Sequence, residues 1–359
     1  MQKTFLIMAM AAFVTVANAQ TDLFKGLERF FTTPESYVVP YTNNPPFIDG
    51  NIDDNAWKNI AWTNEFRDIE GASKPIPYYP TKAKMLWDKD YLYIAAQLTD
   101  KHVWGTLTEH DQVVYFDHDF EVFIDPSNTA HNYFEIEINV LNTIFDLFLS
   151  KPYRSGADVL IQWDCKGLKH AVNVQGSLND ASDEDTGWTV EMAIPYSGLE
   201  RRTPNENDIW RLGFSRVEWE VDIIDGEYVK KKQANGRVLP EHNWVWSPTG
   251  AVAMHMPERW GYIQFAPANS NPIPAFQMPY KELQRQYLWL VFNRQQEYRD
   301  KNKKYALTLA ELKIPAKIQV NGKANTLKMD ATTHQFLATI TDAENHTENI
   351  SHEGKVQGN

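Results

Sequence analysis

The stretch from Asp117 to Phe148 constrains the fold of this chain most, because apolar and polar side chains alternate along two separate runs of it. Every second residue is apolar in the first run, Phe120–Ile124, and in the second, Phe134–Val140. A period of two over this length indicates β-strands that turn one face toward a core. The turn residues Pro126–Asn128 lie between the runs, so we predict an antiparallel hairpin.

The other face of this hairpin is rich in polar groups. It carries Glu121, Glu135, Glu137 and Asn139, and we expect these side chains to point outward. One interpretation is a solvated surface, which is the usual location of charged side chains. The other is a polar floor that hydrogen-bonds a ligand rich in hydroxyl groups. The pattern alone fits both interpretations.

From Lys82 to Phe265 the chain continues this type of pattern. Short strand-like runs are separated by clusters of Gly, Pro, Asn and Asp, and no long helical period interrupts them. Besides the hairpin, the runs are Ala83–Leu86, Tyr91–Leu98, Ile144–Leu149, Lys169–Gln175, Gly187–Ala193, Trp210–Trp219 and Trp260–Phe265. Many short strands with turns between them predict a mainly β chain folded as an antiparallel β-sandwich.

Residues 268–359 differ from this pattern. After a proline-rich linker, the run Lys281–Asp300 places Leu283, Tyr287, Leu290 and other apolar residues on about one helical face. We predict a helix there, followed by a short helix and weak strands. Together they would form a small C-terminal α+β extension, and we expect it to pack on the sandwich without taking part in ligand binding.

Charge and cysteine content exclude several classes of protein. The chain has 359 residues and a net charge of −12, and its 35 Lys and Arg residues form no long basic run. Nucleic acid and anionic membrane surfaces are therefore not expected as partners. A single cysteine, Cys165, can form neither an intramolecular disulfide nor a cysteine-based zinc site.

The N-terminus has the features of a secretion signal. Lys3 supplies the positive start, Phe5–Val16 is apolar, and Ala17–Ala19 fits a small-x-small cleavage site. We predict that residues 1–19 are a cleavable signal peptide and that the mature protein is secreted or periplasmic. Gln20 follows the predicted cut where a lipoprotein would have cysteine, and no apolar run is long enough to span a membrane.

Six segments, in the same order, resemble family 9 carbohydrate-binding modules. They are Ile48–Trp57 (IDGNIDDNAW), Leu86–Asp100, Asp117–Pro126, Gly187–Pro195 (GWTVEMAIP), Trp210–Trp219 and Pro257–Phe265. The resemblance covers about residues 41–267, which we interpret as one domain. It implies a sandwich, of a kind that is also similar to DOMON domains, and a carbohydrate ligand.

The tryptophans divide into two groups on this resemblance. Those at positions that the family uses for its core are Trp57, Trp87, Trp188 and Trp260. Those in or beside loops and strand ends, where they are better placed to meet a ligand, are Trp104, Trp219, Trp244 and Trp246.

The resemblance also suggests where a sugar would bind. In the family, two tryptophans sandwich a terminal sugar, and the corresponding positions here are Tyr115 and Met254. The family's glutamate matches Glu121, but its arginine on the next strand falls near Glu137. We therefore predict a remodelled carbohydrate site formed by Tyr115, Phe116, Glu121, Glu137, Arg216 and Trp244. Arg216 shares a strand face with Phe214 and Glu218, and we expect it to pair with Glu121 or Glu137.

An acidic loop is a candidate metal site. Asp180, Asp183 and Asp185 lie within six residues of one another, and carboxylate oxygens are ligands that calcium prefers. The loop lacks the spacing of an EF-hand. Because the family carries structural calcium, the resemblance implies a calcium ion here.

The function that we predict is non-catalytic carbohydrate binding by a secreted protein, at glycan ends or on short oligosaccharides. Such a protein would support polysaccharide breakdown beside glycan-degrading partner enzymes. The chain contains neither a G-x-S-x-G nor an H-E-x-x-H motif.

Three alternatives remain open. An interaction protein would use the sandwich only as a scaffold. A haem-binding sandwich would take its ligands from Met254–Met256. A glycoside hydrolase would use Glu121 and Glu137 as its pair of carboxylates.

Overall fold

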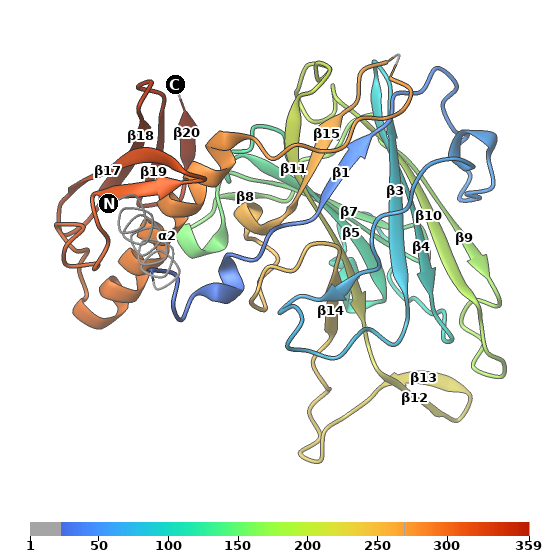
Figure 1. Ribbon diagram of the computed structural model, residues 1–359. Coiled ribbons are helices and arrows are strands. Elements are labelled where there is room, and N and C mark those ends of the chain that lie inside the picture. Colours follow the sequence, from blue (N-terminus) through green and yellow to red (C-terminus); the bar gives the residue numbers. More distant parts are fainter. Residues whose placement is uncertain (1–22, 269, 359) are drawn as a thin grey trace, which may run out of the picture. The chain divides into compact units, whose positions relative to one another are not determined.

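The alternating runs of the sequence form the strands of two facing sheets (Figure 1). The computed structural model describes residues 23–268 and 270–358, so the predicted signal peptide lies outside the described residues. These residues divide into two units, which we call the sandwich unit, Pro34–Phe276, and the C-terminal unit, which joins residues 23–33 to the chain from Gln277 onward. The division at Phe276 falls within the proline-rich segment after Phe265.

The larger sheet of the sandwich unit runs in the order β1-β15-β11-β5-β6-β7-β8, with β14 paired to β11 and β2 paired to β14. Its strands are β1 (Ser36–Val39), β2 (Arg67–Asp68), β5 (Asp119–Asp125), β6 (Tyr133–Asn139), β7 (Ile144–Leu149), β8 (Val159–Leu160), β11 (Ile209–Glu218), β14 (His242–Val245) and β15 (Gly261–Phe265). Neighbours pair antiparallel except β1 and β15, which are parallel. β1 lies before Tyr41, where we predicted the domain to begin.

The smaller sheet runs in the order β3-β4-β10-β9. Its strands are β3 (Thr81–Trp87), β4 (Tyr91–Thr99), β9 (Lys169–Gln175) and β10 (Gly187–Pro195). A short ribbon, β12 (Val221–Ile224) and β13 (Glu227–Lys230), extends from the end of β11. Short 3-10 turns are η2 (Asn55–Trp57), η3 (Val114–Phe116), η4 (Tyr153–Ser155) and η5 (Pro257–Arg259). The prediction of a mainly β, antiparallel sandwich is confirmed.

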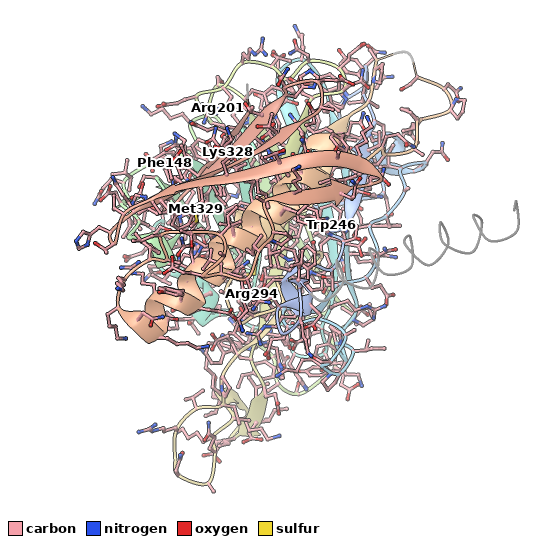
Figure 2. The ribbon with its side chains drawn as sticks, turned by 60° about the vertical axis from the view of Figure 1, so that its left-hand side comes forward. Phe148, Arg201, Trp246, Arg294, Lys328 and Met329 are labelled. Atoms are coloured by element: carbon pink, nitrogen blue, oxygen red, sulfur yellow. The ribbon has the colours of Figure 1, made fainter. Side chains whose placement is uncertain are left out.

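The core lies between the two sheets and contains the apolar face of the hairpin. Phe120 lies opposite Ile138 and Val122 lies opposite Ile136, and all four side chains are buried with residues of β3, β4 and β10. The four tryptophans expected in the core, Trp57, Trp87, Trp188 and Trp260, are buried. So are the four expected near a ligand, Trp104, Trp219, Trp244 and Trp246; the last is labelled in Figure 2. The expectation that these four tryptophans lie open to a ligand is therefore wrong, because their side chains are packed in the interior.

Two of the sequence motifs meet at Glu191 on β10. Its carboxylate accepts hydrogen bonds from the indole N–H of Trp57, at 2.7 Å, and from the backbone N–H groups of Asp49 and Gly50. Gly50 has a φ of 87°, and a Cβ there would lie 2.7 Å from the carbonyl carbon of Val172. The turn around Gly50 therefore packs closely on β9 and is held to β10 by the hydrogen bonds of Glu191.

The C-terminal unit consists of one long helix and a five-stranded antiparallel sheet. Helix α2 (Tyr280–Asn302) packs on a sheet ordered β16-β17-β18-β19-β20. The strands are β16 (Lys317–Val320), β17 (Lys323–Ala331), β18 (Phe336–Asp342), β19 (Thr347–Ser351) and β20 (Val356–Gly358). The predicted helix is confirmed within two residues at each end. Its buried face contacts β18 and β19 of its own unit, where we had expected the sandwich as its partner.

Polar contacts tie the parts of the C-terminal unit together. Gln284 on α2 donates to Asn325 at 2.9 Å, and Arg285 donates to Glu348 at 2.8 Å. Arg294, labelled in Figure 2, donates to the carbonyl oxygens of Leu23 and Lys25 and so holds the segment with the 3-10 turn η1 (Glu28–Phe30) on the helix. Among the described residues, no helix is both long and apolar enough to cross a membrane.

Candidate ligand-binding site

A cavity of about 390 Å³ lies on the second face of the larger sheet, the face that points away from the smaller sheet. Strands β5, β6, β7, β11 and β14 form its floor, and the segments around η3, η4 and residue 255 form its walls. The lining residues are Val113, Tyr115, Glu121, Phe123, Glu135, Glu137, Phe145, Leu147, Tyr153, Val159, Ile161, Val217, Glu241, Asn243, Met254 and His255.

The polar face of the hairpin is buried, so the interpretation as a solvated surface is wrong. The side chains of Glu121, Glu135 and Glu137 are 5%, 5% and 3% exposed. A second apolar layer surrounds them, and it includes Phe123, Tyr133, Phe145, Leu147, Val245 and Trp260. Asn139 is also buried, and its amide donates to the carbonyl oxygen of Leu107 and to the carboxylate of Asp117.

The carboxyl groups on this floor are crowded and lack cationic partners. Glu121 lies directly opposite Glu137, and the two share a group with Asp119 in which one ligand atom of each lies within 4.8 Å of the others. Burial raises the pKa of Glu121 to about 7 and that of Glu135 to about 8. Burial and repulsion by Glu121 raise the pKa of Glu137 well above its usual range. Near neutral pH these groups therefore hold protons that ordinary glutamates have lost.

Apolar and aromatic groups flank the floor on both sides. Tyr115, from η3, and Met254 line the same cavity, as the family's clamp positions imply. Tyr153 is 53% exposed, and its ring centroid lies 4.4 Å from that of His255. Burial lowers the pKa of His255 to about 4, so this imidazole is neutral, and its Nδ1 lies 2.9 Å from the Tyr133 hydroxyl. Phe116 is 50% exposed and packs on Tyr115, but it does not line the cavity.

A match to a described family covers residues 48–244, which is more than half of the chain, and that family is described as carbohydrate family 9 binding domain-like. The chain belongs to this family. Nearly all the lining residues fall inside the matched range, and Met254 and His255 follow shortly after it.

Two curated relatives align with part of the chain. It is 27% identical to endo-1,4-beta-xylanase A of Thermoanaerobacterium saccharolyticum over 169 residues, 47% of this chain and 12% of that protein. It is also 27% identical to exoglucanase XynX of Acetivibrio thermocellus over 154 residues, 43% of this chain and 12% of that protein. The aligned part thus spans about an eighth of each relative.

Two solved structures are similar. One is a family 9 carbohydrate-binding module from Caldicellulosiruptor kristjanssonii in complex with cellotriose, with a TM-score of 0.44 and 18% identity over 68% of this chain and 100% of that chain. The other is a putative carbohydrate-binding protein from Bacteroides uniformis, with a TM-score of 0.47 and 15% identity over 65% of this chain and 100% of that chain.

Arg216 does not lie in this cavity, so its predicted pairing with Glu121 or Glu137 is wrong. Glu121 lies opposite Ser215 on β11, so Arg216 points to the other face of the sheet, as Phe214 does. There its guanidinium contacts Glu218 at 2.6 Å and Asp100 at 3.2 Å. Alternation had already placed Arg216 with Phe214, and the error was to assign that face to the outside.

Trp244 is also on the inner face and does not line the cavity. It lies opposite Arg216 in the β11–β14 ladder and is buried in the core, where its ring packs against Tyr78. The neighbouring residue Asn243 lines the cavity instead. The prediction of Trp244 as a site residue was therefore off by one position along the strand, and one position reverses the face.

The sequence analysis missed further cavity residues, among them Tyr153, Ile161, Glu241 and Asn243. Alternation along His242–Trp246 contained the signal for Asn243, because Trp244 and Trp246 share the inner face and leave Asn243 on the other. Tyr153 belongs to a 3-10 turn after β7, and no periodic pattern marks it.

The carboxylates of the acidic loop hydrogen-bond to groups of the loop and of its neighbours. The backbone N–H of Ser182 donates to Asp180, the hydroxyl of Ser177 donates to Asp183, and Asp185 accepts from the backbone N–H groups of Val103 and Ser177. Over residues 23–268 and 270–358, these three carboxylates do not form a group whose ligand atoms converge. The three carboxylates therefore serve local hydrogen bonds, and calcium binding by this loop stays a prediction.

The three residues Met254–Met256, which the haem alternative would use, differ in their relation to the cavity. Met254 and His255 line the cavity, whereas Met256 does not. Haem binding stays a prediction, and a Soret band in the purified protein is the measurement that would reveal it.

Proposed function

We propose that this chain binds carbohydrate without acting on it, and that the ligand enters the cavity over β5 and β6. The single observation that carries the proposal is the convergence of Tyr115, Met254 and Glu121 on one cavity. These are the positions that correspond to the two clamp residues and the glutamate of the family. Family membership and buried polar groups in an otherwise apolar pocket support the same conclusion.

The chemistry of the cavity suits a sugar ring. Tyr115 and Tyr153 offer aromatic faces for the apolar side of the ring, and Glu121 and Glu137 offer carboxyl groups for its hydroxyls. Hydrogen bonds between neutral groups contribute roughly 0.5–1.5 kcal/mol each, and those to an ionised carboxylate roughly 1.5–3 kcal/mol. The cavity is at the small end of ligand pockets, so it suits a glycan end or a short oligosaccharide. We expect affinity in the micromolar range, about −8 kcal/mol.

Hydrolysis is the second candidate, because the carboxyl oxygens of Glu121 and Glu137 lie within 4.8 Å of each other. Retaining glycosidases separate their carboxyl groups by about 5–5.5 Å, but they need one group ionised and the other protonated. Here burial raises the pKa of both groups. The two carboxyls are thus not differentiated into acid and nucleophile, which favours binding alone. Reducing-sugar release from xylan or cellulose by the purified protein is the test.

The names of the relatives suggest which glycans to test first. One is an endo-1,4-beta-xylanase and the other an exoglucanase, so we propose xylan and β-glucan fragments as ligands. A role beside glycan-degrading enzymes, outside the cytoplasm, accords with the predicted signal peptide. Mass spectrometry of protein exported from its native host tests the leader, and we expect a mature N-terminus at Gln20.

The decisive experiment is calorimetry with xylo- and cello-oligosaccharides. Wild type, Tyr115→Ala, Glu121→Gln and the control Glu109→Gln, an exposed glutamate outside the cavity, are compared. We expect Tyr115→Ala and Glu121→Gln to weaken binding by up to about tenfold, one hydrogen bond or stacked ring each. The control should bind as wild type does. Wild-type affinity in both cavity variants, with unchanged circular dichroism, would place the site elsewhere.

A further inference from the structure

The floor of the cavity contains three carboxyl groups arranged as a ligand set. Asp119, Glu121 and Glu137 are all buried, and one ligand atom from each lies within 4.8 Å of the others. One oxygen of each, Oδ2 of Asp119 and Oε2 of Glu121 and of Glu137, has no hydrogen-bond partner. Buried polar atoms are almost always hydrogen-bonded, so three such oxygens in one place require an explanation.

Their surroundings make the ionised form of this arrangement costly unless a cation is bound. Glu121 and Glu135 repel Asp119, as does Asp117 two residues before it, and Glu241 repels Glu121. No lysine or arginine within the described ranges forms an ion pair with Asp119, Glu121 or Glu137. The nearby imidazole of His255 is kept neutral by burial. Buried charges in proteins are normally paired or coordinate a metal.

Two of the three carboxyl groups can be reached from the cavity, unlike polar groups that are enclosed in a core. Glu121 and Glu137 line the cavity, so an ion bound between them would face the ligand space. Ser215 lies directly opposite Glu121 in the β5–β11 ladder and adds a buried hydroxyl on the same face. The donors are all oxygens, which is the set preferred by hard divalent cations such as calcium.

We propose that Asp119, Glu121 and Glu137 hold a calcium ion at the floor of the cavity, with its open coordination positions facing the carbohydrate. Calcium takes six to eight oxygen ligands, more than three carboxylates supply, so water or vicinal sugar hydroxyls would complete the shell. This inference rests on the proposed function for the identity of the ligand but not for the ion itself.

The chain contains a second group of convergent metal-ligand atoms, so a metal titration has to distinguish binding at the two groups. The ligand atoms of His110, Asp111, Asp146 and Asp164 also converge, away from the cavity walls. His110 and Asp164 are exposed, and this set includes an imidazole. Asp164→Asn is therefore a matched control, because it removes one carboxylate from a convergent group that does not line the cavity.

The test is calorimetric titration of calcium chloride into the chelator-treated full chain. We expect wild type and Asp164→Asn to bind calcium alike, and Glu137→Gln to bind it more than about tenfold more weakly, since loss of a metal-site residue typically costs that much. Glu121→Gln and Asp119→Asn serve as further variants, with circular dichroism as the fold control. Calcium binding that Asp164→Asn abolishes and the cavity variants retain would overturn the inference. So would the absence of calcium binding at millimolar concentration.

Oligosaccharide titrations with calcium and with chelator separate this inference from the proposed function. Affinity that falls about tenfold or more in chelator supports a metal-bridged sugar. Equal affinity in both conditions would overturn the bridging ion and leave carbohydrate binding intact. Calcium binding at the cluster without any oligosaccharide binding would overturn the proposed function and leave the ion.

Discussion

The two faces of the larger sheet around β11 carry contrasting groups of buried charges. On the inner face, the cations Arg216 and His118 meet the carboxylates of Asp100 and Glu218, with contacts of 2.6–3.6 Å between them. On the outer face, Asp119, Glu121 and Glu137 meet with no cation beside them. The burial of the two groups is similar, whereas the balance of charge differs.

This contrast separates a structural network from a binding site. On the inner face, burial disfavours the charged form of His118, but Glu218 and Asp100 outweigh it and raise its pKa. Burial likewise opposes ionisation of Asp100, but His118 and Arg216 outweigh it and lower its pKa. The charged forms of His118 and Asp100 are therefore stabilised from within the protein, whereas burial and Asp100 raise the pKa of Glu218 to about 7. The outer carboxyls have no such compensation, which is the state expected of groups that await a ligand.

The largest effect should come from breaking the balanced side. Arg216→Met would leave Asp100 and Glu218 buried beside one imidazole, and loss of one partner of a buried ion pair costs about 3–5 kcal/mol. We expect urea unfolding to report this loss, or the protein not to fold. Arg201→Met, at an exposed arginine labelled in Figure 2, is the control and should change little. Near wild-type stability of Arg216→Met would show that the inner network is dispensable.

The unbalanced side should make stability depend on pH. Folding raises the pKa of Glu121 from 4.5 to about 7 and that of Glu135 from 4.5 to about 8. The folded protein therefore binds these protons more tightly than the unfolded chain. The resulting stability is complete below the unfolded pKa and is lost as pH rises through the folded pKa. We expect the free energy of unfolding to fall between about pH 5 and 8, by at most about 1.4 kcal/mol per pH unit for each carboxyl.

Removing the carboxyls from the outer face sharpens the same comparison. Glu121→Gln and Glu135→Gln should each flatten the fall, and the measurement is urea unfolding of chelator-treated protein at several pH values. Other groups that face this cluster, Asp117, Glu241 and Tyr115, are present in every variant. A slope in both variants as steep as in wild type would assign the pH dependence to the inner network instead.

The smallest effect on binding should come from Trp244, which the sequence placed in the site and the structure places in the core. Trp244→Phe keeps an aromatic ring beside Tyr78, so we expect oligosaccharide affinity within about twofold of wild type, less than 0.5 kcal/mol. Calorimetry beside Tyr115→Ala makes the comparison. A loss in Trp244→Phe as large as in Tyr115→Ala would mean that the inner face contributes to the site.

Most of the fold could be predicted because alternation and turn residues are local signals. The alternation of Phe120, Val122 and Ile124 correctly predicted which face of the hairpin lies in the core. The short strand β1 could not be found this way, because four residues are too few to show a period and its pairing with the distant β15 decides it.

The site was predicted less well, and the reason lies in the second apolar layer. The sequence showed that Glu121 and Glu137 share a face, but a hairpin alone does not reveal that other segments cover that face. Arg216 illustrates the consequence, since a face assumed to be open was in fact the core. Only the resemblance pointed to Tyr115, which lines the cavity, because a tyrosine in a short turn has no periodic signal.

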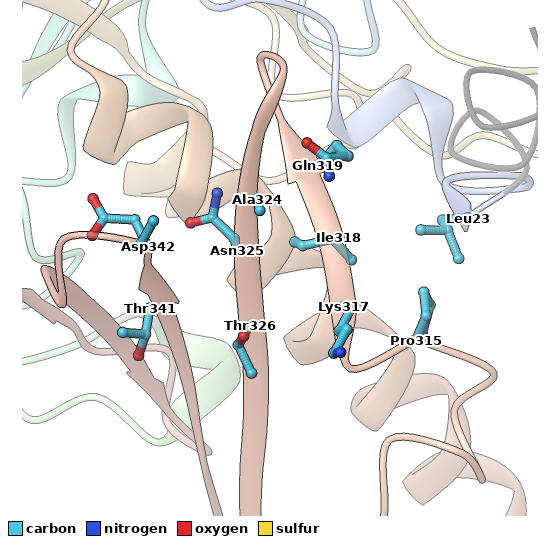
Figure 3. Close-up of a pocket in the computed structure, with 11 residues that line it drawn as sticks. Leu23, Pro315, Lys317, Ile318, Gln319, Ala324, Asn325, Thr326, Thr341 and Asp342 are labelled. Atoms are coloured by element: carbon cyan, nitrogen blue, oxygen red, sulfur yellow. The ribbon is translucent and has the colours of Figure 1, made fainter. Parts of the chain in front are cut away.

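The most direct test of the central claim is a crystal structure of the chain with the xylo- or cello-oligosaccharide that binds best. Our account predicts sugar density over Glu121 and Glu137, between Tyr115 and Met254. The C-terminal unit has a cavity of its own, about 550 Å³, beside β16 and β17 (Figure 3). Sugar density there, or anywhere other than the floor of β5 and β6, would contradict the account.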